Sequence, residues 1–175
     1  MHHLGMENTV VEFVDPGTLV KSKFQRRVDL RLTPEFVESI RTHGVIEPIV
    51  ARRVYAGDGS QDLLPEILCG ERRAAGAIEA GNPRVPVIFR EATDSQAKEI
   101  VLIENLQRVD LTPLEECDGY TLLYVDGWKP EQIAAKVGKP SGGYVARRLN
   151  LRFLTSECKQ ALAMVWCSPN RSCDK

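Results

Sequence analysis

The spacing of hydrophobic residues changes near residue 94 of the chain. Before this point, short apolar runs bounded by Gly, Pro or Asp alternate with segments of helical spacing. The predicted strands are residues 9–14, 49–55, 64–68 and 85–89. Two helices are predicted between them, over residues 34–43 and 71–80, because each carries an apolar stripe and ends at a glycine. The first half therefore predicts a small mixed-sheet unit.

After residue 94 the pattern is helical throughout, and each predicted helix begins at a proline or a capping residue. The predicted helices are residues 94–107, 113–127, 130–137, 141–153 and 156–165. The sequence thus predicts an α+β protein, with a mixed-sheet domain over residues 1–110 and an all-helical domain over residues 111–175. The boundary between the two domains is predicted near residues 108–113.

Length and composition narrow the class of protein. The 175 residues suit one domain or two small ones, and 43% hydrophobic with 27% charged residues is ordinary for a globular chain. The longest apolar run, residues 161–167, is too short to cross a bilayer. Residues 1–20 lack the features of a secretory signal, and no two cysteines form a C-x-x-C pair. We expect a cytoplasmic protein with reduced thiols.

Charge is distributed unevenly along a chain whose formal net charge is −1. Residues 128–153 contain six Lys or Arg residues and one acidic residue, Glu131. Two short predicted helices flank a turn at residues 138–140 in this stretch, which is the pattern of a helix-turn-helix. Such short patterns also arise by chance. The local positive charge favours DNA binding, because phosphate contacts supply most of the nonspecific affinity for DNA.

The second helix of this pair is predicted to carry the contacts with DNA. Ser141 is its expected N-cap, Val145 and Leu149 form its buried side, and its arginines point outward. The predicted DNA-binding residues are Lys139, Ser141, Tyr144, Arg147, Arg148 and Arg152.

A glycine turn precedes the helix predicted over residues 71–80. Gly70 follows a predicted strand, and Arg72 and Arg73 lie in the first turn of the helix. Free N–H groups at a helix N-terminus favour an anion, and arginines there oppose the helix dipole. This arrangement indicates a phosphate site. A solvated helix start with surface ion pairs around Glu71 accounts for the same residues equally well.

Ionisable residues extend the apolar face of the helix predicted over residues 94–107. Ile100 and Val101 mark this face, and its continuation reaches Glu104 and then Arg108. Buried charges need a partner, a metal or a ligand. An intrahelical salt bridge between Glu104 and Arg108 is the alternative, because their spacing is favourable for one.

Together these motifs resemble those of the ParB family of chromosome and plasmid partition proteins. Residues 70–74 (GERRA) are similar to the family's GERR box, and residues 104–115 (ENLQRVDLTPLE) are similar to its ENLQR segment. Residues 43–49 resemble the segment that lines the family's nucleotide-base pocket, and residues 22–27 resemble a weaker upstream box. The resemblance implies a ParB/sulfiredoxin-like fold for the first domain.

The resemblance further implies a CTP- and Mg²⁺-dependent DNA clamp that forms a homodimer. The implied nucleotide-binding residues are Gln25, Arg26, Gly44, Val45, Ile46, Glu47, Pro48, Gly70, Glu71, Arg72, Arg73, Ala74, Asn105 and Arg108. Glu104 and Asn105 would bind Mg²⁺, and Glu71 with Glu104 would support slow CTP hydrolysis. The implied partners are a centromere-like site in double-stranded DNA and a ParA-type ATPase, and the implied location is the nucleoid or a plasmid.

The sequence departs from the family pattern at several points. Glu47 stands where Gln is common, and Gly142 with Gly143 leaves the start of the second helix without side chains to read bases. Residues 1–20 contain no Lys or Arg, although a basic N-terminal peptide usually stimulates the family's ATPase. The family's C-terminal dimerisation domain has no counterpart, so we expect either a truncated helical domain or a divergent, shorter relative. A transcriptional regulator and a nuclease-like enzyme on the same fold are the alternative functions.

Overall fold

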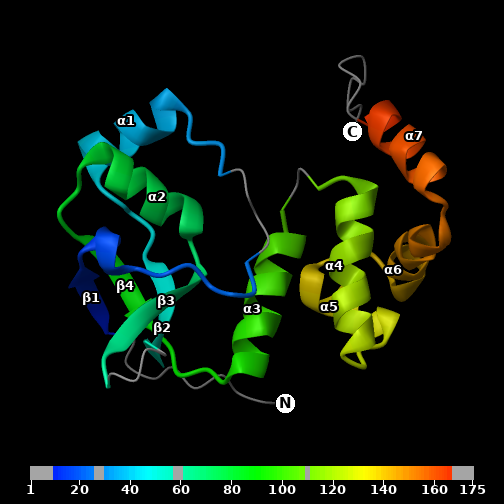
Figure 1. The fold of residues 1–175 in the computed structure, drawn as a ribbon, viewed down its shortest axis with the longest axis horizontal. Coiled ribbons are helices and arrows are strands. Elements are labelled where there is room, and N and C mark those ends of the chain that lie inside the picture. The colour runs from blue at the N-terminus through cyan, green and yellow to red at the C-terminus, as the bar shows by residue number, and fades with distance from the viewer. Residues whose placement is uncertain (1–9, 26–29, 57–60, 109–110, 167–175) are drawn as a thin grey trace. The chain divides into compact units, whose positions relative to one another are not determined.

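The structure is a computed structural model that describes residues 10–25, 30–56, 61–108 and 111–166 (Figure 1). Its backbone contacts divide the chain into two units, Met1–Val101 and Leu102–Lys175. The boundary lies within helix α3 (Asp94–Leu106) and not in the loop after it, where the sequence pattern predicts it. The last turn of α3 belongs to the second unit because Leu102 and Leu106 are buried among the helices that follow.

The first unit is built on a four-stranded mixed sheet with the strand order β1-β4-β2-β3. Its strands are β1 (Val11–Val14), β2 (Ile49–Tyr55), β3 (Leu63–Cys69) and β4 (Val85–Phe89). Strand β4 pairs antiparallel with β1 and parallel with β2, whereas β2 and β3 form an antiparallel hairpin. All four predicted strands are confirmed, but β1 begins at Val11 and β3 is one residue longer at each end than predicted. Thr9, in the first predicted strand, lies outside the described residues.

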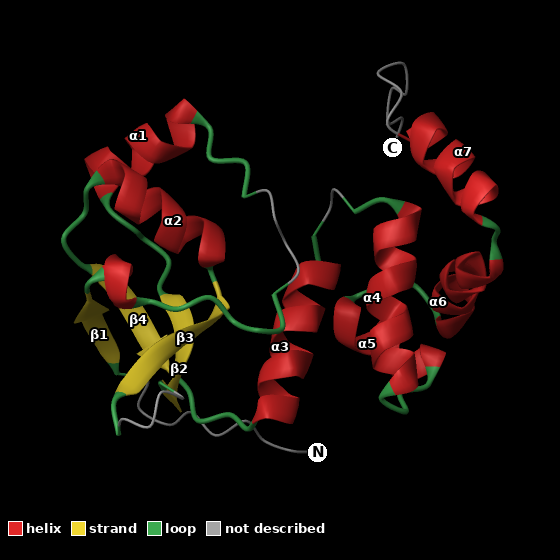
Figure 2. Cartoon of the chain, in the orientation of Figure 1, coloured by secondary structure: helices red, strands yellow, loops and turns green. Residues whose placement is uncertain are grey.

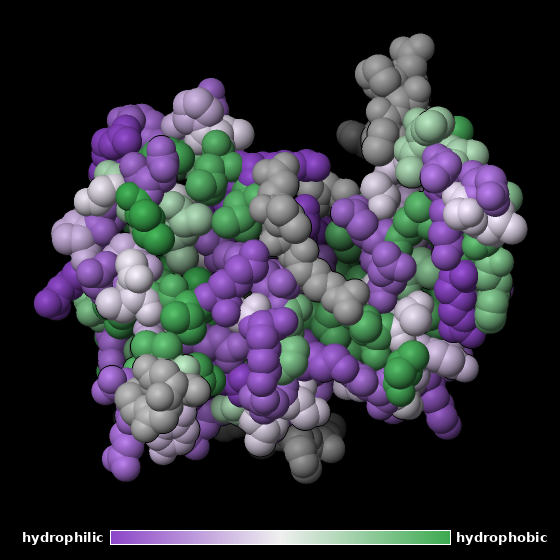
Figure 3. Space-filling view, viewed as in Figure 1, coloured by the Kyte–Doolittle hydropathy of each residue, from purple (hydrophilic) through white to green (hydrophobic). Residues whose placement is uncertain are grey.

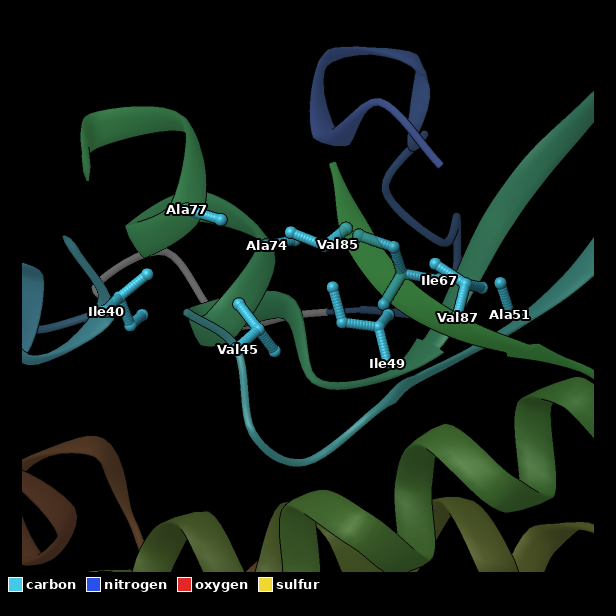
Figure 4. Close-up of a cluster of buried hydrophobic side chains, with 9 residues drawn as sticks. All are labelled: Ile40, Val45, Ile49, Ala51, Ile67, Ala74, Ala77, Val85 and Val87. Atoms are coloured by element: carbon cyan, nitrogen blue, oxygen red, sulfur yellow. The ribbon is translucent and has the colours of Figure 1, made fainter. Parts of the chain in front are cut away.

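Different helices cover the two faces of this sheet, because successive side chains of a strand point to opposite faces (Figure 2). On one face, Ile67 packs in a core with α1 (Pro34–His43) and α2 (Glu71–Ala80). On the other face, its neighbour Leu68 packs with Ala97 and Val101 of α3. Figure 4 shows the first of these cores, whose members are Ile40, Val45, Ile49, Ala51, Ile67, Ala74, Ala77, Val85 and Val87.

Helices α1 and α2 pack closely at a glycine. Thr33 caps α1 by accepting a hydrogen bond from the N–H of Phe36, as its sequence predicts. A Cβ atom at Gly76 of α2 would lie 2.7 Å from Cδ1 of Ile40 and 2.8 Å from Cε1 of Phe36. The absence of a side chain at Gly76 therefore sets the distance between the two helices.

The chain segment before α1 runs along the edge of strand β3. The short 3-10 turn η1 (Pro16–Thr18) leads into it. The N–H of Val20 donates to the carbonyl oxygen of Pro65, and its carbonyl accepts from the N–H of Ile67, both at 2.9 Å. These bonds fix the residues that lead into the predicted upstream box.

The second unit is helical, as predicted. After the last turn of α3 it contains α4 (Pro113–Val125), α5 (Pro130–Val137), α6 (Gly142–Leu149), the 3-10 turn η2 (Asn150–Phe153) and α7 (Ser156–Trp166). Its core consists of Leu102, Leu106, Tyr120, Leu123, Ile133, Ala134, Val137, Val145 and Leu149. The helix predicted over residues 141–153 is wrong in its last four residues, where the backbone tightens into a 3-10 turn at Asn150, a residue of low helix propensity.

Helix α7 differs from the other helices of the second unit in its exposure. Its residues include no buried side chain, and Met164 and Val165 are exposed. Figure 3 shows hydrophobic side chains at the surface over this helix. Within the described ranges, no helix is both long enough and apolar enough to span a membrane.

Candidate nucleotide and DNA sites

Gly70 forms the turn between β3 and α2, where the sequence predicts a phosphate site. Its φ of 99° lies in the left-handed region, which favours glycine. A Cβ atom at Gly70 would lie 3.3 Å from the guanidinium group of Arg73. The glycine therefore permits both the turn and the close approach of this arginine, and it places the free N–H groups of α2 beside a cation.

Arg73 connects this turn to the segment predicted to bind the base. Its Nη1 atom donates to the carbonyl oxygens of Glu47 at 2.6 Å and Pro48 at 2.9 Å. The same atom lies 3.1 Å from a carboxylate oxygen of Glu47, whose side chain is 82% exposed. The structure thus brings residues 47–48 and the Gly70 turn together within one unit. This link between distant residues was not predicted from the sequence.

Glu71 and Arg72 are held against the protein beside the same turn. Oε1 of Glu71 pairs with Nζ of Lys21 at 2.9 Å, and the Glu71 side chain is 12% exposed. The guanidinium of Arg72 lies 4.0 Å from the centre of the Phe36 ring. Oε2 of Glu71 and Nε of Arg72 are buried and make no hydrogen bond with any described residue. The ion pair of Glu71 with Lys21 agrees with the alternative of a helix start with surface ion pairs, but the low exposure of the Glu71 side chain does not agree with a solvated one. The orphaned carboxylate oxygen fits a site that accepts a ligand.

A buried ion-pair network holds the beginning of the upstream box. Nε of Arg52 donates to Oε2 of Glu66 at 2.5 Å, and its Nη2 donates to Asp94 at 2.6 Å. The other oxygen of Glu66 accepts from the Ser22 hydroxyl at 2.9 Å and from the backbone N–H of Lys23. Hydrogen bonds from Lys23 and then Arg52 keep the pKa of the Asp94 carboxyl below its ordinary value.

Sequence reasoning missed this network. Arg52 and Glu66 each lie inside a predicted apolar strand, and that placement was the available signal. The pairing itself joins residues 14 positions apart on neighbouring strands. It therefore depends on the register of the β2–β3 hairpin.

The remaining nucleotide-site residues fall into different parts of the chain. Gln25 is half-buried at the end of the upstream segment, and Arg26 lies outside the described residues. Glu104, Asn105 and Arg108 are half-buried at and after the end of α3, in the second unit, and each interacts with other residues. Their joint action with the Gly70 turn stays a prediction.

The proposed metal ligands fit Mg²⁺ in chemical type but not in number. A carboxylate oxygen of Glu104 and an amide oxygen of Asn105 are hard ligands of the kind that Mg²⁺ takes. Among the residues with described positions, no group of three or more His, Cys, Asp and Glu side chains is placed to hold a metal. Mg²⁺ would therefore take most of its ligands from phosphate oxygens and water.

Helices α5 and α6 form the predicted helix-turn-helix. Gly138 ends α5 with a φ of 72°, and Ser141 caps α6 by accepting from the N–H of Tyr144. A Cβ atom at Gly142 would lie 2.6 Å from Oε1 of Glu131 on α5. The absence of a side chain at Gly142 thus leaves room for the Glu131 side chain beside the start of α6.

A buried carboxylate lies behind the basic side of α6. Glu116 of α4 is 4% exposed and accepts from Nε of Arg148 at 2.8 Å and from the Tyr144 hydroxyl at 2.9 Å. It also pairs with Nζ of Lys139 at 2.7 Å, and Tyr120 donates to it at 3.3 Å. Burial alone would raise the pKa of Glu116, but hydrogen bonds from Lys139 and Tyr144 outweigh it and keep that pKa below its ordinary value.

Glu116 changes the charge that α6 presents. The prediction that the α6 arginines all point outward is wrong for Arg148, whose side chain is 29% exposed and paired with Glu116. Arg147 is exposed, and Arg152 lies over the Phe153 ring at 4.5 Å. Glu116 lies outside the basic stretch, so a count along the sequence missed it. Glu116 lies on the apolar face of a predicted helix, next to Cys117 in the chain. This position was the one sign in the sequence that its carboxylate is buried.

The first unit has an arginine-linked glycine turn beside a mixed sheet, and the second has a helix-turn-helix. Together these features place the chain in a candidate class, the nucleotide-regulated DNA-binding proteins. Residues 2–106 match the ParB N-terminal domain family. The chain therefore belongs to the ParB family, which confirms the resemblance seen in its motifs.

Two relatives and one solved structure illustrate the similarity. Chromosome-partitioning protein Spo0J of Thermus thermophilus is 41% identical over 128 residues, which are 73% of this chain and 45% of that protein. A nucleoid occlusion protein of Halalkalibacterium halodurans is 37% identical over 147 residues, which are 82% of this chain and 49% of that protein. The chain thus spans about half the length of these curated relatives.

A solved structure is similar to this chain over a range of residues that includes parts of both units. The crystal structure of C-terminally truncated ParB from Caulobacter crescentus, complexed to the centromeric parS site, has a TM-score of 0.71 and 31% sequence identity. The match covers 88% of this chain and 78% of that chain. The predicted α+β fold, with a mixed sheet followed by helices, is confirmed.

Proposed function

We propose that this chain is a DNA-binding clamp of the ParB type, controlled by CTP and Mg²⁺ and acting in chromosome or plasmid segregation. The observation that carries the proposal is that one chain combines the arginine-linked Gly70 turn with the α5–α6 helix-turn-helix. The similarity in fold to a ParB protein complexed with parS DNA supports it. A homodimer, a ParA-type ATPase partner and a location at the nucleoid or a plasmid belong to the same proposal.

In the first unit, the triphosphate would lie at the Gly70 turn. The N–H groups at the start of α2 and the guanidinium groups of Arg72 and Arg73 attract negative charge there. Arg73 would exchange the Glu47 carboxylate for a phosphate oxygen. This exchange costs little, because an ion pair with an exposed carboxylate contributes only about 0–1 kcal/mol. The base would lie against residues 44–48, which Arg73 holds next to the turn.

Slow CTP hydrolysis would use the carboxylates of Glu71 and Glu104. Oε2 of Glu71 has no hydrogen-bond donor among the described residues, and in this proposal it would orient a water molecule beside the phosphates. Glu104 and Asn105 would hold Mg²⁺, which when bound neutralises charge on the phosphate oxygens. The part of these two residues in the nucleotide site rests on the family resemblance.

Calorimetric titration with CTP, ATP, GTP and UTP, each with and without Mg²⁺, tests the nucleotide part of the proposal. We expect heat with CTP above the other three, and only with the metal present. Arg73→Ala should abolish it, because a multidentate charged contact is lost. Arg41→Ala is the matched control, since Arg41 is an exposed arginine on α1 that pairs with Glu38.

The same samples separate the alternative functions. Absence of heat with all four nucleotides, together with retained binding to duplex DNA, would refute the clamp and favour a transcriptional regulator. Cleavage of the duplex in the presence of Mg²⁺ would instead favour a nuclease-like enzyme.

A further inference from the structure

We propose that Glu116 is a positioning residue for DNA recognition. Arg148 and Lys139 form ion pairs with Glu116 that hold α6 and the turn before it in place, and they do not contact phosphates directly. This inference rests on the proposed DNA binding of α6. It assigns different roles to two neighbouring arginines, Arg147 and Arg148, that look equivalent in the sequence.

The contacts of Glu116 join three parts of the second unit. The carboxylate lies on α4, next to the hydroxyl of Tyr120 from the same helix. It forms an ion pair with Lys139 from the turn between α5 and α6. It also accepts hydrogen bonds from Tyr144 and Arg148 of α6 itself. A single buried group therefore ties both the turn and the recognition helix to α4.

The geometry also determines which positively charged side chains are available to contact DNA phosphates. Lys139 and Arg148 share one carboxylate, and their side chains are 22% and 29% exposed. Nη2 of Arg148 makes a further hydrogen bond, at 3.2 Å, to the Tyr144 hydroxyl. Arg147 is instead exposed on the same helix. A cation held by a buried carboxylate releases few counterions on DNA binding, whereas an exposed arginine that contacts a phosphate releases about one.

Salt dependence separates this role from a purely structural one. A structural role for Glu116 predicts that its replacement lowers thermal stability and leaves the number of phosphate contacts unchanged or smaller. A positioning role predicts that replacing Glu116 frees two cations for nonspecific contact with phosphates. It also predicts that the turn and α6 lose their fixed orientation, so discrimination between DNA sequences falls.

The experiment is a fluorescence-anisotropy titration of the full chain over a series of NaCl concentrations. The probes are a labelled duplex carrying the parS site of the Caulobacter crescentus complex and a scrambled duplex of equal length. The variants are Arg147→Ala, Arg148→Ala and Glu116→Gln, which keeps the size of the side chain and removes its charge. A thermal melt of each variant identifies those that are folded.

We expect Arg147→Ala to flatten the slope of log affinity against log salt on the scrambled duplex by about 0.9, the value for one phosphate. Arg148→Ala should flatten the slope by less than half as much. Glu116→Gln should steepen it by about 1 to 2, because Lys139 and Arg148 become available. Glu116→Gln should also lower the ratio of parS affinity to scrambled-duplex affinity.

Two results would overturn the inference while leaving the proposed DNA binding intact. One is a slope for Arg148→Ala as flat as that for Arg147→Ala, and the other is a slope for folded Glu116→Gln no steeper than wild type. If Glu116→Gln does not fold, the comparison of the two arginine variants decides alone. A wild-type chain without affinity for either duplex would overturn both the proposed function and this inference.

Discussion

Arg52→Ala is predicted to destabilise the first unit strongly, because it leaves a buried carboxylate without its cation. The side chains of Arg52 and Glu66 are only 5% and 6% exposed. Removing one partner of a buried ion pair typically costs about 3–5 kcal/mol. The hydroxyl of Ser22 and the N–H of Lys23 still donate to Glu66 in the variant. We therefore expect a loss at the lower end of this range, about 3 kcal/mol.

Arg53 provides a matched control on the same strand. It follows Arg52 and so points to the opposite face of the sheet, where its side chain is 47% exposed. It pairs with Glu12 at 2.9 Å and lies 3.9 Å from the centre of the Phe89 ring. Exposed ion pairs contribute about 0–1 kcal/mol, and exposed cation–π contacts about 0.5–1 kcal/mol. Arg53→Ala should therefore cost about 1 kcal/mol.

Spectroscopy can follow the two units separately. Both tryptophans, Trp128 and Trp166, lie in the second unit, whereas the sheet lies in the first. For a unit of this size, 1 kcal/mol shifts Tm by about 4–8 °C. Far-UV circular dichroism should therefore place the first-unit transition of Arg52→Ala at least about 12 °C below wild type. Tryptophan fluorescence should report an unchanged transition of the second unit.

An equal lowering of the first transition by Arg52→Ala and Arg53→Ala would show that the unpaired, buried Glu66 carboxylate does not destabilise the first unit. The double variant Arg52→Met with Glu66→Met gives a second check, because it removes both charges and keeps apolar volume. Replacement of an entire buried pair by apolar side chains is often neutral or stabilising. This double variant should therefore melt above Arg52→Ala, and a lower Tm would contradict the assigned role of the unpaired Glu66 charge.

Two further predictions concern the second unit and the α1–α2 contact. The pKa of Glu116 is lowered on folding, so its stabilisation is present above the ordinary value of 4.5 and is lost as pH falls through the lower folded value. The fluorescence-detected Tm should therefore fall in acid below this pH, and folded Glu116→Gln should show a weaker dependence. Gly76→Val should cost about 1–3 kcal/mol by overpacking against Ile40, measured by urea denaturation. The exposed substitution Glu79→Ala should leave the midpoint near wild type, and an equal loss in both variants would contradict the packing argument.

Local preferences in the sequence determined the secondary structure and the positions of the main turns. Thr33 and Ser141 cap helices, and Gly70 and Gly138 adopt left-handed conformations at the turns where the sequence places them. Such choices depend on residues only a few positions away, so they are readable without a fold. The motifs around Gly70 also indicated the family, which the comparison with known proteins confirmed.

Tertiary structure decided which charges meet. Arg73 reaches the carbonyl of Glu47, 26 positions earlier, and Arg148 reaches Glu116, 32 positions earlier. Neither contact follows from local periodicity, because each depends on the packing of separate elements. The basic stretch of residues 128–153 therefore had a predictable formal charge but not a predictable surface charge. A carboxylate from α4, buried by folding, neutralises part of that charge because low exposure to water strengthens its pairing with Lys139 and Arg148.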